Sequence, residues 1–254
     1  MKVDSFDEMI AKSYNYDDRE YHHSPHWSIA KSLFVKNYLC VSGGDSVIPK
    51  KIHQIWLGGE VPEKYEYFMQ SWKRFHPTWE YRLWTDADAE SFGMERIDAY
   101  HSSSNMGTRS DIFSYEILRR HGGLYVDTDF ECLKPFDDLL HLSFFAGISY
   151  DAKFVLYHGL MASIPNHPIL ERCVNDMGAG YDGNDGTRIM EATGPYHLTR
   201  CFISGVYNAP DGVVAFPMEY FYPLPNNKRH DTDPYKYVTD KSLAIHHFFV
   251  SWLK

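Results

Sequence analysis

Apolar and polar positions along this chain follow two different periods, and the change from one period to the other predicts alternating strands and helices. Short apolar or alternating runs follow turn residues such as Pro49 and the pair Gly122-Gly123, which is typical of buried strands. Between these runs, apolar residues recur three and four positions apart, as on helices with one buried face. We predict strands at residues 51–57, 80–84, 124–126, 143–148, 156–162, 213–216 and 243–247, and helices at 63–75, 109–121, after Pro168 and at 187–203.

The order of these elements predicts an α/β fold. Strands that alternate with helices are expected to form a mixed sheet with helices on both faces, and residues 1–45 are expected to add a helical N-terminal extension. The chain has 254 residues, of which 44% are apolar, so it can bury a sizeable core. No internal repeat, low-complexity tract or linker divides it. We therefore expect a single domain.

Charge and composition narrow the classes of function. A formal charge of −9 argues against nucleic acid as a partner, because such proteins need clustered Lys and Arg. The four cysteines show no pairing or zinc spacing and are expected to be reduced thiols. The acidic N-terminus does not resemble a signal peptide, and no apolar run has membrane-spanning length. We expect a cytoplasmic protein.

The segment 27–41 places apolar residues at helical spacing beside Lys31 and Lys36. Such a helix suits docking on a membrane surface, although packing on the protein core is the favoured interpretation. Peripheral association with the inner face of a membrane is therefore part of our expectation.

Two carboxylates directly after an apolar strand give the clearest chemical signal. Asp127 and Asp129 follow residues 122–126, and residues i and i+2 of an extended chain point to the same face. Two such carboxylates suit Mg²⁺ or Mn²⁺, which leave their other positions to water and phosphate oxygens. The pattern indicates a site for a nucleotide diphosphate. The alternative is a solvated turn in which Asp127 caps a backbone N–H group.

Three blocks of sequence carry a family resemblance. They are residues 48–58 (IPKKIHQIWLG), the segment from Ser110-Asp111 to the GGLYVDTD run at 122–129, and the closing residues 246–252 (HHFFVSW). Together they resemble the D-x-D sugar transferases, which include fungal initiating mannosyltransferases, bacterial capsular and cell-surface polysaccharide transferases and, more distantly, the glucosylating bacterial toxins. The resemblance spans residues 48–252.

This resemblance implies a GT-A fold with a Rossmann-like sheet across residues 1–254. It implies a nucleotide-binding half at 46–140 and an acceptor-binding half at 141–254. The implied reaction is a retaining, metal-dependent transfer of a hexose from a UDP- or GDP-sugar to a glycan or lipid-linked acceptor, in surface polysaccharide synthesis. In such a same-face reaction the departing phosphate can take the acceptor proton, so no dedicated protein base is expected.

Carried over to this chain, the resemblance makes Asp127 and Asp129 the catalytic carboxylates and metal ligands, with His246 as a third ligand. Imidazole suits Mn²⁺ better than Mg²⁺, so manganese is the expected ion and magnesium the alternative. His247 points to the other strand face and is expected to be structural, although a slip of one residue would exchange the two histidines.

On the donor side, the resemblance places Trp56 on the nucleobase, with the backbone of Ile55 and Leu57 near the edges of the base. It assigns Asp111 to ribose or sugar hydroxyls. Each role has a structural alternative. Trp56 would otherwise be a core residue, and residues 108–111 would form a capping box at a helix start.

The positive charge and the diphosphate donors complete the expected donor site. The family usually has an arginine three residues after the aspartate at 111, whereas this chain has Ser114. Arg109 is the nearest residue that could supply this charge, although it lies on the opposite side of the first helical turn. Ser251 and the indole of Trp252 resemble the family's donors to the diphosphate.

The acceptor side gives weaker signals. The aromatic residues 220–222 suit either sugar stacking or a core, and the core is commoner. The Thr193-Gly194-Pro195 turn and His158-Gly159 are expected near the donor sugar. Two other classes stay open: a haloacid-dehalogenase-type phosphatase, which Glu131 disfavours, and a catalytically silent nucleotide-sugar-binding protein, which Ser114 makes conceivable.

Overall fold

A mixed six-stranded sheet forms the centre of the protein in a computed structural model, which describes residues 5–13, 15–41, 43–150, 152–179, 181–183 and 185–249. The strand order is β2-β1-β3-β6-β5-β7, and β4 pairs with β8 in a separate two-stranded sheet. The strands are β1 Lys51–Ile55, β2 Glu80–Trp84, β3 Gly123–Val126, β4 Phe130–Cys132, β5 Phe144–Ile148, β6 Leu156–Ser163, β7 Val213–Phe216 and β8 Ala244–His246.

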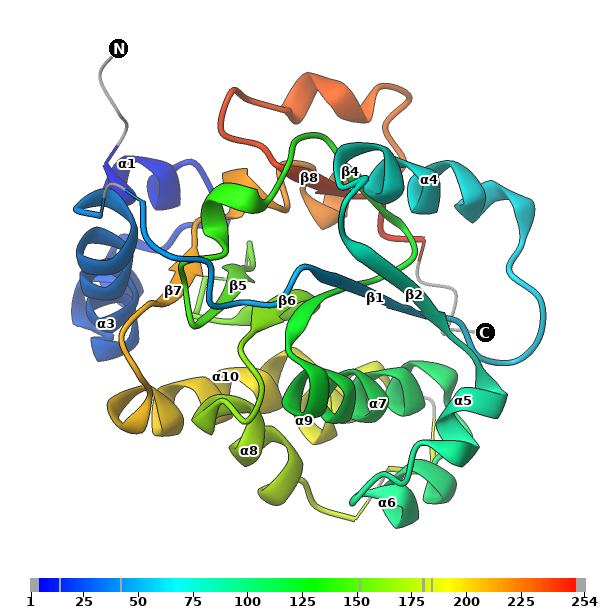
Figure 1. Ribbon diagram of the computed structural model, residues 1–254. Helices are drawn as coiled ribbons and strands as arrows, with labels where there is room; N and C mark the ends of the chain where they lie inside the picture. Colours follow the sequence, from blue (N-terminus) through cyan, green and yellow to red (C-terminus); the bar gives the residue numbers. More distant parts are fainter. Residues whose placement is uncertain are drawn as a thin grey trace.

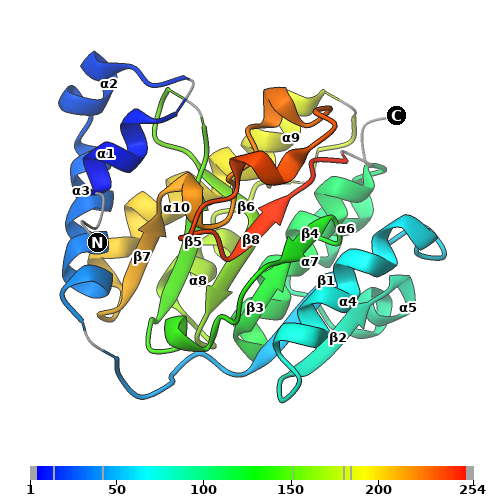
Figure 2. The ribbon, with the colours of Figure 1, turned by 90° about the horizontal axis from the view of Figure 1, so that it is seen from above.

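Helices cover both faces of this sheet (Figures 1 and 2). In Figure 1, α7, α8 and α10 lie below the sheet, whereas α4 and the β4–β8 pair lie above it. The α/β class, the GT-A arrangement and the helices on both faces agree with the prediction. The helices are α1 Phe6–Ala11, α2 Asp18–His23, α3 Pro25–Phe34, α4 Glu66–Phe75, α5 Asp86–Ser91, α6 Ile97–Ser102, α7 Met106–His121, α8 Pro168–Asn175, α9 Gly186–Ala192 and α10 Pro195–Gly205.

Strand direction brings one set of strand ends together. β1 is parallel to β2 and to β3, whereas β6 is antiparallel to β3, with Val126 opposite Leu160. The carboxyl ends of β1 and β3 therefore lie at the same edge, next to the middle of β6 at Leu160. In open α/β sheets, ligands bind at this edge. The sheet continues across the expected division at residue 140, and the division into nucleotide-binding and acceptor-binding halves stays a prediction.

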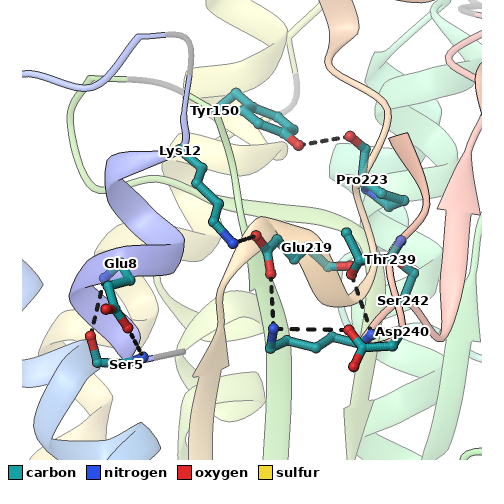
Figure 3. Close-up of polar contacts among 10 residues, drawn as sticks. Ser5, Glu8, Lys12, Tyr150, Glu219, Pro223, Thr239, Asp240 and Ser242 are labelled. Atoms are coloured by element: carbon teal, nitrogen blue, oxygen red, sulfur yellow. Dashed lines mark hydrogen bonds and ion pairs between the residues drawn. The ribbon is translucent and has the colours of Figure 1, made fainter. Parts of the chain in front are cut away.

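The helical N-terminal extension is confirmed for its described residues. Helix α3 packs beside β7, and the buried ring of Phe34 contacts Phe216 with ring centroids 5.8 Å apart. After α1, Lys12 forms an ion pair with Glu219 at 2.9 Å (Figure 3). The segment 27–41 therefore packs on the core, as favoured. None of the helices that the structure describes combines the length and the apolar character needed to cross a membrane.

Several element boundaries differ from the sequence prediction. β1 ends at Ile55, and the helix expected at 63–75 begins as a 3₁₀ turn at Glu63–Tyr65 before α4. The helix expected at 187–203 is two helices, α9 and α10, separated at Thr193 and Gly194. Proline cannot continue a preceding helix, so α10 starts afresh at Pro195. Short elements α5, α6 and β4 were not predicted.

All four cysteines are unpaired, as expected. Cys40 is exposed, and the other three are buried. Cys173 on α8 and Cys201 on α10 lie with His197 in one buried cluster, with their ligand atoms within 4.8 Å of one another.

The aromatic residues 220–222 are also buried, so their interpretation as core residues holds.

Candidate active site

Asp127 follows β3 and is fixed from two neighbouring strands. Its backbone N–H donates to the carbonyl of Gly159 on β6 at 2.8 Å. The side-chain Nε2 of Gln54 on β1 donates to the Asp127 carbonyl at 3.2 Å. The carboxylate is held as well, because the Tyr125 hydroxyl donates to Oδ1 at 2.7 Å. Asp127 is therefore a positioned residue at the sheet edge, and the solvated-turn interpretation is wrong.

Gly159 makes room for this carboxylate. A Cβ atom built on Gly159 would lie 2.7 Å from Oδ2 of Asp127, which is closer than real Cβ atoms approach an oxygen. The backbone of β6 and the carboxylate are therefore in direct contact, and a side chain at position 159 would displace one of them.

The β4–β8 pair brings the C-terminal block to the same place. Phe130 is opposite His246 in this antiparallel pair, and their rings stack with centroids 4.3 Å apart. His246 Nε2 lies 3.0 Å from Asp129 Oδ1, and the Phe249 N–H donates to Asp129 Oδ2 at 2.8 Å. Phe248 has φ 51°, a left-handed conformation that turns the chain between His246 and Phe249. Such strain is commonly found at functional sites.

Asp127, Asp129 and His246 thus converge, with one potential ligand atom from each within 4.8 Å of the others. This is the convergence that the sequence predicts. Two carboxylates and an imidazole are a donor set that fits Mn²⁺ or Mg²⁺. Among the residues that the structure describes, the buried Nδ1 atom of His246 has no hydrogen-bond partner. That these residues hold a metal stays a prediction.

The electrostatics of the pair also favour a cation. Burial raises the pKa of Asp127, and the nearby charge of Asp129 raises it further, against the opposing effect of His158 and His246. Burial also acts to raise the pKa of Asp129, but the charge and hydrogen bond of His246 hold it below the ordinary value. Two close carboxylates cannot both ionise without cost, and a divalent ion removes that cost.

His247 faces away from this cluster, as predicted. Its Nε2 lies 3.3 Å from Glu131 Oε2, and its ring stacks on Phe68 with centroids 4.4 Å apart. Glu131 also accepts hydrogen bonds from the hydroxyls of Tyr67 and Tyr235. His247 and Glu131 are therefore held in hydrogen bonds that connect β4 and the chain after β8 with Tyr67 and Tyr235.

Asp111 lies inside helix α7, and the alternative interpretation of residues 108–111 as a capping box is wrong. The helix begins at Met106, and the N-cap is Asn105, whose side chain accepts from the Thr108 N–H at 3.1 Å. The Asp111 carboxylate forms a close ion pair with His158 on β6 and accepts from the Thr193 hydroxyl at 2.8 Å. The structure therefore joins Asp111, His158 and Thr193, three positions expected near the donor sugar.

The side chains of Arg109 and Ser114 contact the protein away from the Asp111 carboxylate. The Arg109 Nε donates to the Ser103 carbonyl at 2.7 Å, and its guanidinium lies over the Tyr100 ring. This places Arg109 against α6, and its predicted role in holding the donor finds no support in these contacts. Ser114 is buried, and its hydroxyl donates to the Asp111 carbonyl at 2.8 Å. Neither residue supplies a positive charge to the Asp111 carboxylate.

Trp56 follows the last residue of β1, and its side chain is half-buried. Its ring packs on Tyr65 with centroids 4.7 Å apart. Ile55 is buried and Leu57 is half-buried. Trp56 is therefore not the fully buried core tryptophan of the alternative interpretation, and its stacking on a base stays a prediction. Ser251 and Trp252 lie outside the described residues.

Sequence reasoning missed several residues that build the site. Tyr125 lies two positions before Asp127, so the period of the strand already places both side chains on one face. Gln54 is a fully buried polar residue on β1, and its burial in a strand was the signal that could have marked it. The Phe249 N–H and the Gly159 contact have no such signal, because both depend on the pairing of distant segments.

Comparisons with known proteins find similarity to glycosyltransferases. Residues 62–145 match the family described as a glycosyltransferase sugar-binding region containing a DXD motif. Inositol phosphoceramide mannosyltransferase 2 of Schizosaccharomyces pombe is 34% identical over 147 residues, which cover 53% of this chain and 39% of the relative. An uncharacterized glycosyltransferase, L373, of Acanthamoeba polyphaga mimivirus is 28% identical over 81% of this chain and 84% of its own length.

A solved structure shares the fold. The domain titled PaToxG Glycosyltransferase superposes with a TM-score of 0.53 at 17% identity, covering 76% of this chain and 82% of that domain. The chain spans about two fifths of the length of the S. pombe mannosyltransferase. The resemblance to D-x-D glycosyltransferases and the GT-A fold class, both expected from the sequence, are confirmed.

Proposed function

We propose that this protein is a metal-dependent glycosyltransferase that moves a hexose, with mannose preferred, from a nucleotide sugar to a glycan or lipid-linked acceptor. One observation carries the proposal: Asp127, Asp129 and His246, which come from distant parts of the chain, converge at the ligand-binding edge of the sheet. The match of residues 62–145 to the DXD family supports it. The names of similar proteins support the choice of mannose.

In this proposal, different residues bind the nucleobase and the diphosphate of the donor. Trp56, half-exposed at the end of β1, stacks on the nucleobase, a contact that contributes about 1–3 kcal/mol per base in nucleic-acid systems. Tyr125 and the Phe249 N–H hold the carboxylates of Asp127 and Asp129 in place. A divalent ion bound between these carboxylates would neutralise charge that develops on the leaving diphosphate.

The proposed stereochemical course is retention, which rests on the family resemblance. In the proposed retaining reaction, the acceptor hydroxyl attacks the sugar from the face that the diphosphate leaves. The departing phosphate then takes the acceptor proton, so the protein needs to supply no separate base. Retention of configuration is part of the proposal, and the anomeric configuration of the product tests it directly.

The acceptor is proposed from the relatives. Several similar proteins are named for inositol phosphoceramide, a lipid, and this favours a lipid-linked acceptor over a free glycan. A lipid-linked acceptor would bring the protein to a membrane surface, in keeping with the peripheral association and cytoplasmic location expected from the sequence. A role in surface polysaccharide synthesis stays a prediction.

A transfer assay tests the proposal. Purified protein is incubated with GDP-mannose, UDP-glucose or UDP-galactose and Mn²⁺, together with phosphoinositol-containing lipid or short glycan acceptors. Products are detected by mass spectrometry. We expect sugar transfer or slow donor hydrolysis that EDTA abolishes and that Asp129→Asn removes, whereas Asp211→Asn, at an exposed aspartate paired with Lys36, leaves it unchanged.

Two results would contradict the proposal. Metal-dependent hydrolysis of p-nitrophenyl phosphate without any nucleotide-sugar turnover would favour the phosphatase class. Binding of nucleotide sugars without hydrolysis or transfer, across all donors and acceptors, would favour a catalytically silent binding protein.

A further inference from the structure

Both carboxylate oxygens of Asp111 are already used inside the protein. Oδ1 forms a close ion pair with Nε2 of His158, and Oδ2 accepts from the Thr193 hydroxyl at 2.8 Å. Asp111 is 4% exposed. Each oxygen could accept a further hydrogen bond, but burial leaves almost none of this carboxylate accessible to a ligand. We therefore expect Asp111 to act through a neighbouring side chain.

His158 is that neighbour, and it lies at the surface of the site. Its side chain is 16% exposed, compared with 6% for Asp111. Nε2 is committed to Asp111, whereas Nδ1 makes no hydrogen bond to any of the described residues. Imidazole can donate or accept at this atom, so His158 offers one oriented polar atom to a ligand.

The strand that carries His158 is shaped locally for this orientation. The pairing of β6 with β5 shifts register, since Tyr157 is opposite Gly147 whereas Met161 is opposite Ala146. Irregularities of this kind re-aim side chains beside active sites. The next residue, Gly159, contacts the Asp127 carboxylate. His158 therefore projects from a bulged stretch of β6 directly beside the DXD aspartate.

The two histidines near Asp127 contact different carboxylates. His246 comes from β8 and contacts Asp129, whereas His158 comes from β6 and contacts Asp111 on α7. If Asp127, Asp129 and His246 gather the diphosphate, the α7 side is left for the sugar attached to it. The partly exposed polar groups on that side are the imidazole of His158 and the hydroxyl of Ser110, which suit the recognition of sugar hydroxyls.

We propose that His158 binds a hydroxyl of the transferred sugar through Nδ1, and that Asp111 acts as a positioning residue that fixes the imidazole ring. This inference rests on the proposed function, because it assigns a sugar to the site. It differs from the family assignment, in which the aspartate at 111 meets the sugar itself.

Calorimetry with two matched ligand pairs tests the inference. The pairs are GDP with GDP-mannose and UDP with UDP-glucose, each titrated with Mn²⁺ into wild-type protein and into His158→Ala, His158→Gln and His101→Ala. His101 is an exposed histidine on α6 and serves as the control. For the pair that the wild-type protein prefers, we expect His158→Ala to weaken nucleotide-sugar binding about tenfold and the nucleoside diphosphate less than about twofold. His158→Gln should recover part of the loss, and His101→Ala should change neither.

A double-mutant cycle separates positioning from a purely structural role. Asp111→Asn should weaken nucleotide-sugar binding, and the double variant with His158→Ala should be no weaker than His158→Ala alone. Additive losses, or equal losses for the sugar-bearing and sugar-free ligands, would overturn the inference while leaving the proposed function intact. Failure of wild-type protein to bind any of the four nucleotides would instead refute the proposed function.

Discussion

Replacing Gly159 by alanine tests the geometry of the site with a single methyl group. The added Cβ would lie 2.7 Å from Asp127 Oδ2 and 3.3 Å from its Cγ, so the carboxylate must move by several tenths of an ångström. It cannot rotate without cost, because Tyr125 holds Oδ1 at 2.7 Å. The methyl group therefore separates Asp127 from Asp129 and His246 or breaks its hydrogen bond to Tyr125.

The expected effect is larger on function than on stability. Extra methyl groups in packed sites typically cost about 1–3 kcal/mol, which lowers the melting temperature of a domain of this size by about 2–4 °C per kcal/mol. A misplaced metal-site carboxylate is expected to cost about 10- to 100-fold in metal affinity, as disturbed supporting contacts do elsewhere. We therefore expect Gly159→Ala to fold, to need about 10- to 100-fold more Mn²⁺ and to lose turnover at limiting Mn²⁺.

The assay is the dependence of nucleotide-sugar hydrolysis or transfer on Mn²⁺ concentration, with circular dichroism as the folding control. Gly186→Ala is the matched variant, since a Cβ at Gly186 meets nothing within 4 Å. If Gly159→Ala kept the wild-type Mn²⁺ requirement and turnover, the contact between β6 and Asp127 would not define the site, and the reasoning would be refuted.

Three further predictions follow from the same contacts. In EDTA at neutral pH, Asp127→Asn should raise the melting temperature, because the raised pKa of Asp127 means that its ionised form is unfavourable in the folded protein. Asp129→Asn should lower the melting temperature, because the pKa of Asp129 is depressed and its ionised form is stabilised. Shifts of the same sign for the two variants would contradict this reasoning. Burial lowers the pKa of His158, but the Asp111 carboxylate raises it more strongly, to about 9. The stabilising contribution of His158 in EDTA should therefore be full below pH 6.5 and fall as the pH rises towards 9. In urea unfolding measured across this pH range, His158→Gln should reduce that fall. Trp56→Ala should weaken nucleotide binding about tenfold or more with little change in melting temperature; unchanged affinity in calorimetry would remove its stacking role.

Local sequence signals were sufficient to predict most of the sheet. β2 begins and ends where the alternation of apolar residues predicts, and β7 is the apolar run predicted at 213–216. β4 was missed because it is a three-residue strand directly after the DXD motif, stabilised by pairing with β8 more than a hundred residues later. Short strands have little period to detect, and their existence depends on a distant partner.

In the site, too, features set by nearby residues could be predicted, whereas contacts between distant segments could not. The convergence of Asp127 and Asp129 with His246 could be expected from strand geometry together with the family resemblance. The role of Asp111 could not, since Thr108 to Asp111 matches a capping box, and only the position of Asn105 shows that the helix starts earlier. The pairing of Asp111 with His158 joins α7 to β6, and no spacing within either segment predicts it.

Uptake of Mn²⁺ measured by electron paramagnetic resonance tests the central claim most directly. Free Mn²⁺ gives a strong signal that is lost on binding, so bound ions can be counted in the presence of GDP or UDP. We predict about one ion per chain for the wild-type protein and for Asp211→Asn, and almost none for Asp129→Asn. Equal uptake by Asp129→Asn, or no uptake by the wild-type protein with either nucleotide, would contradict the account.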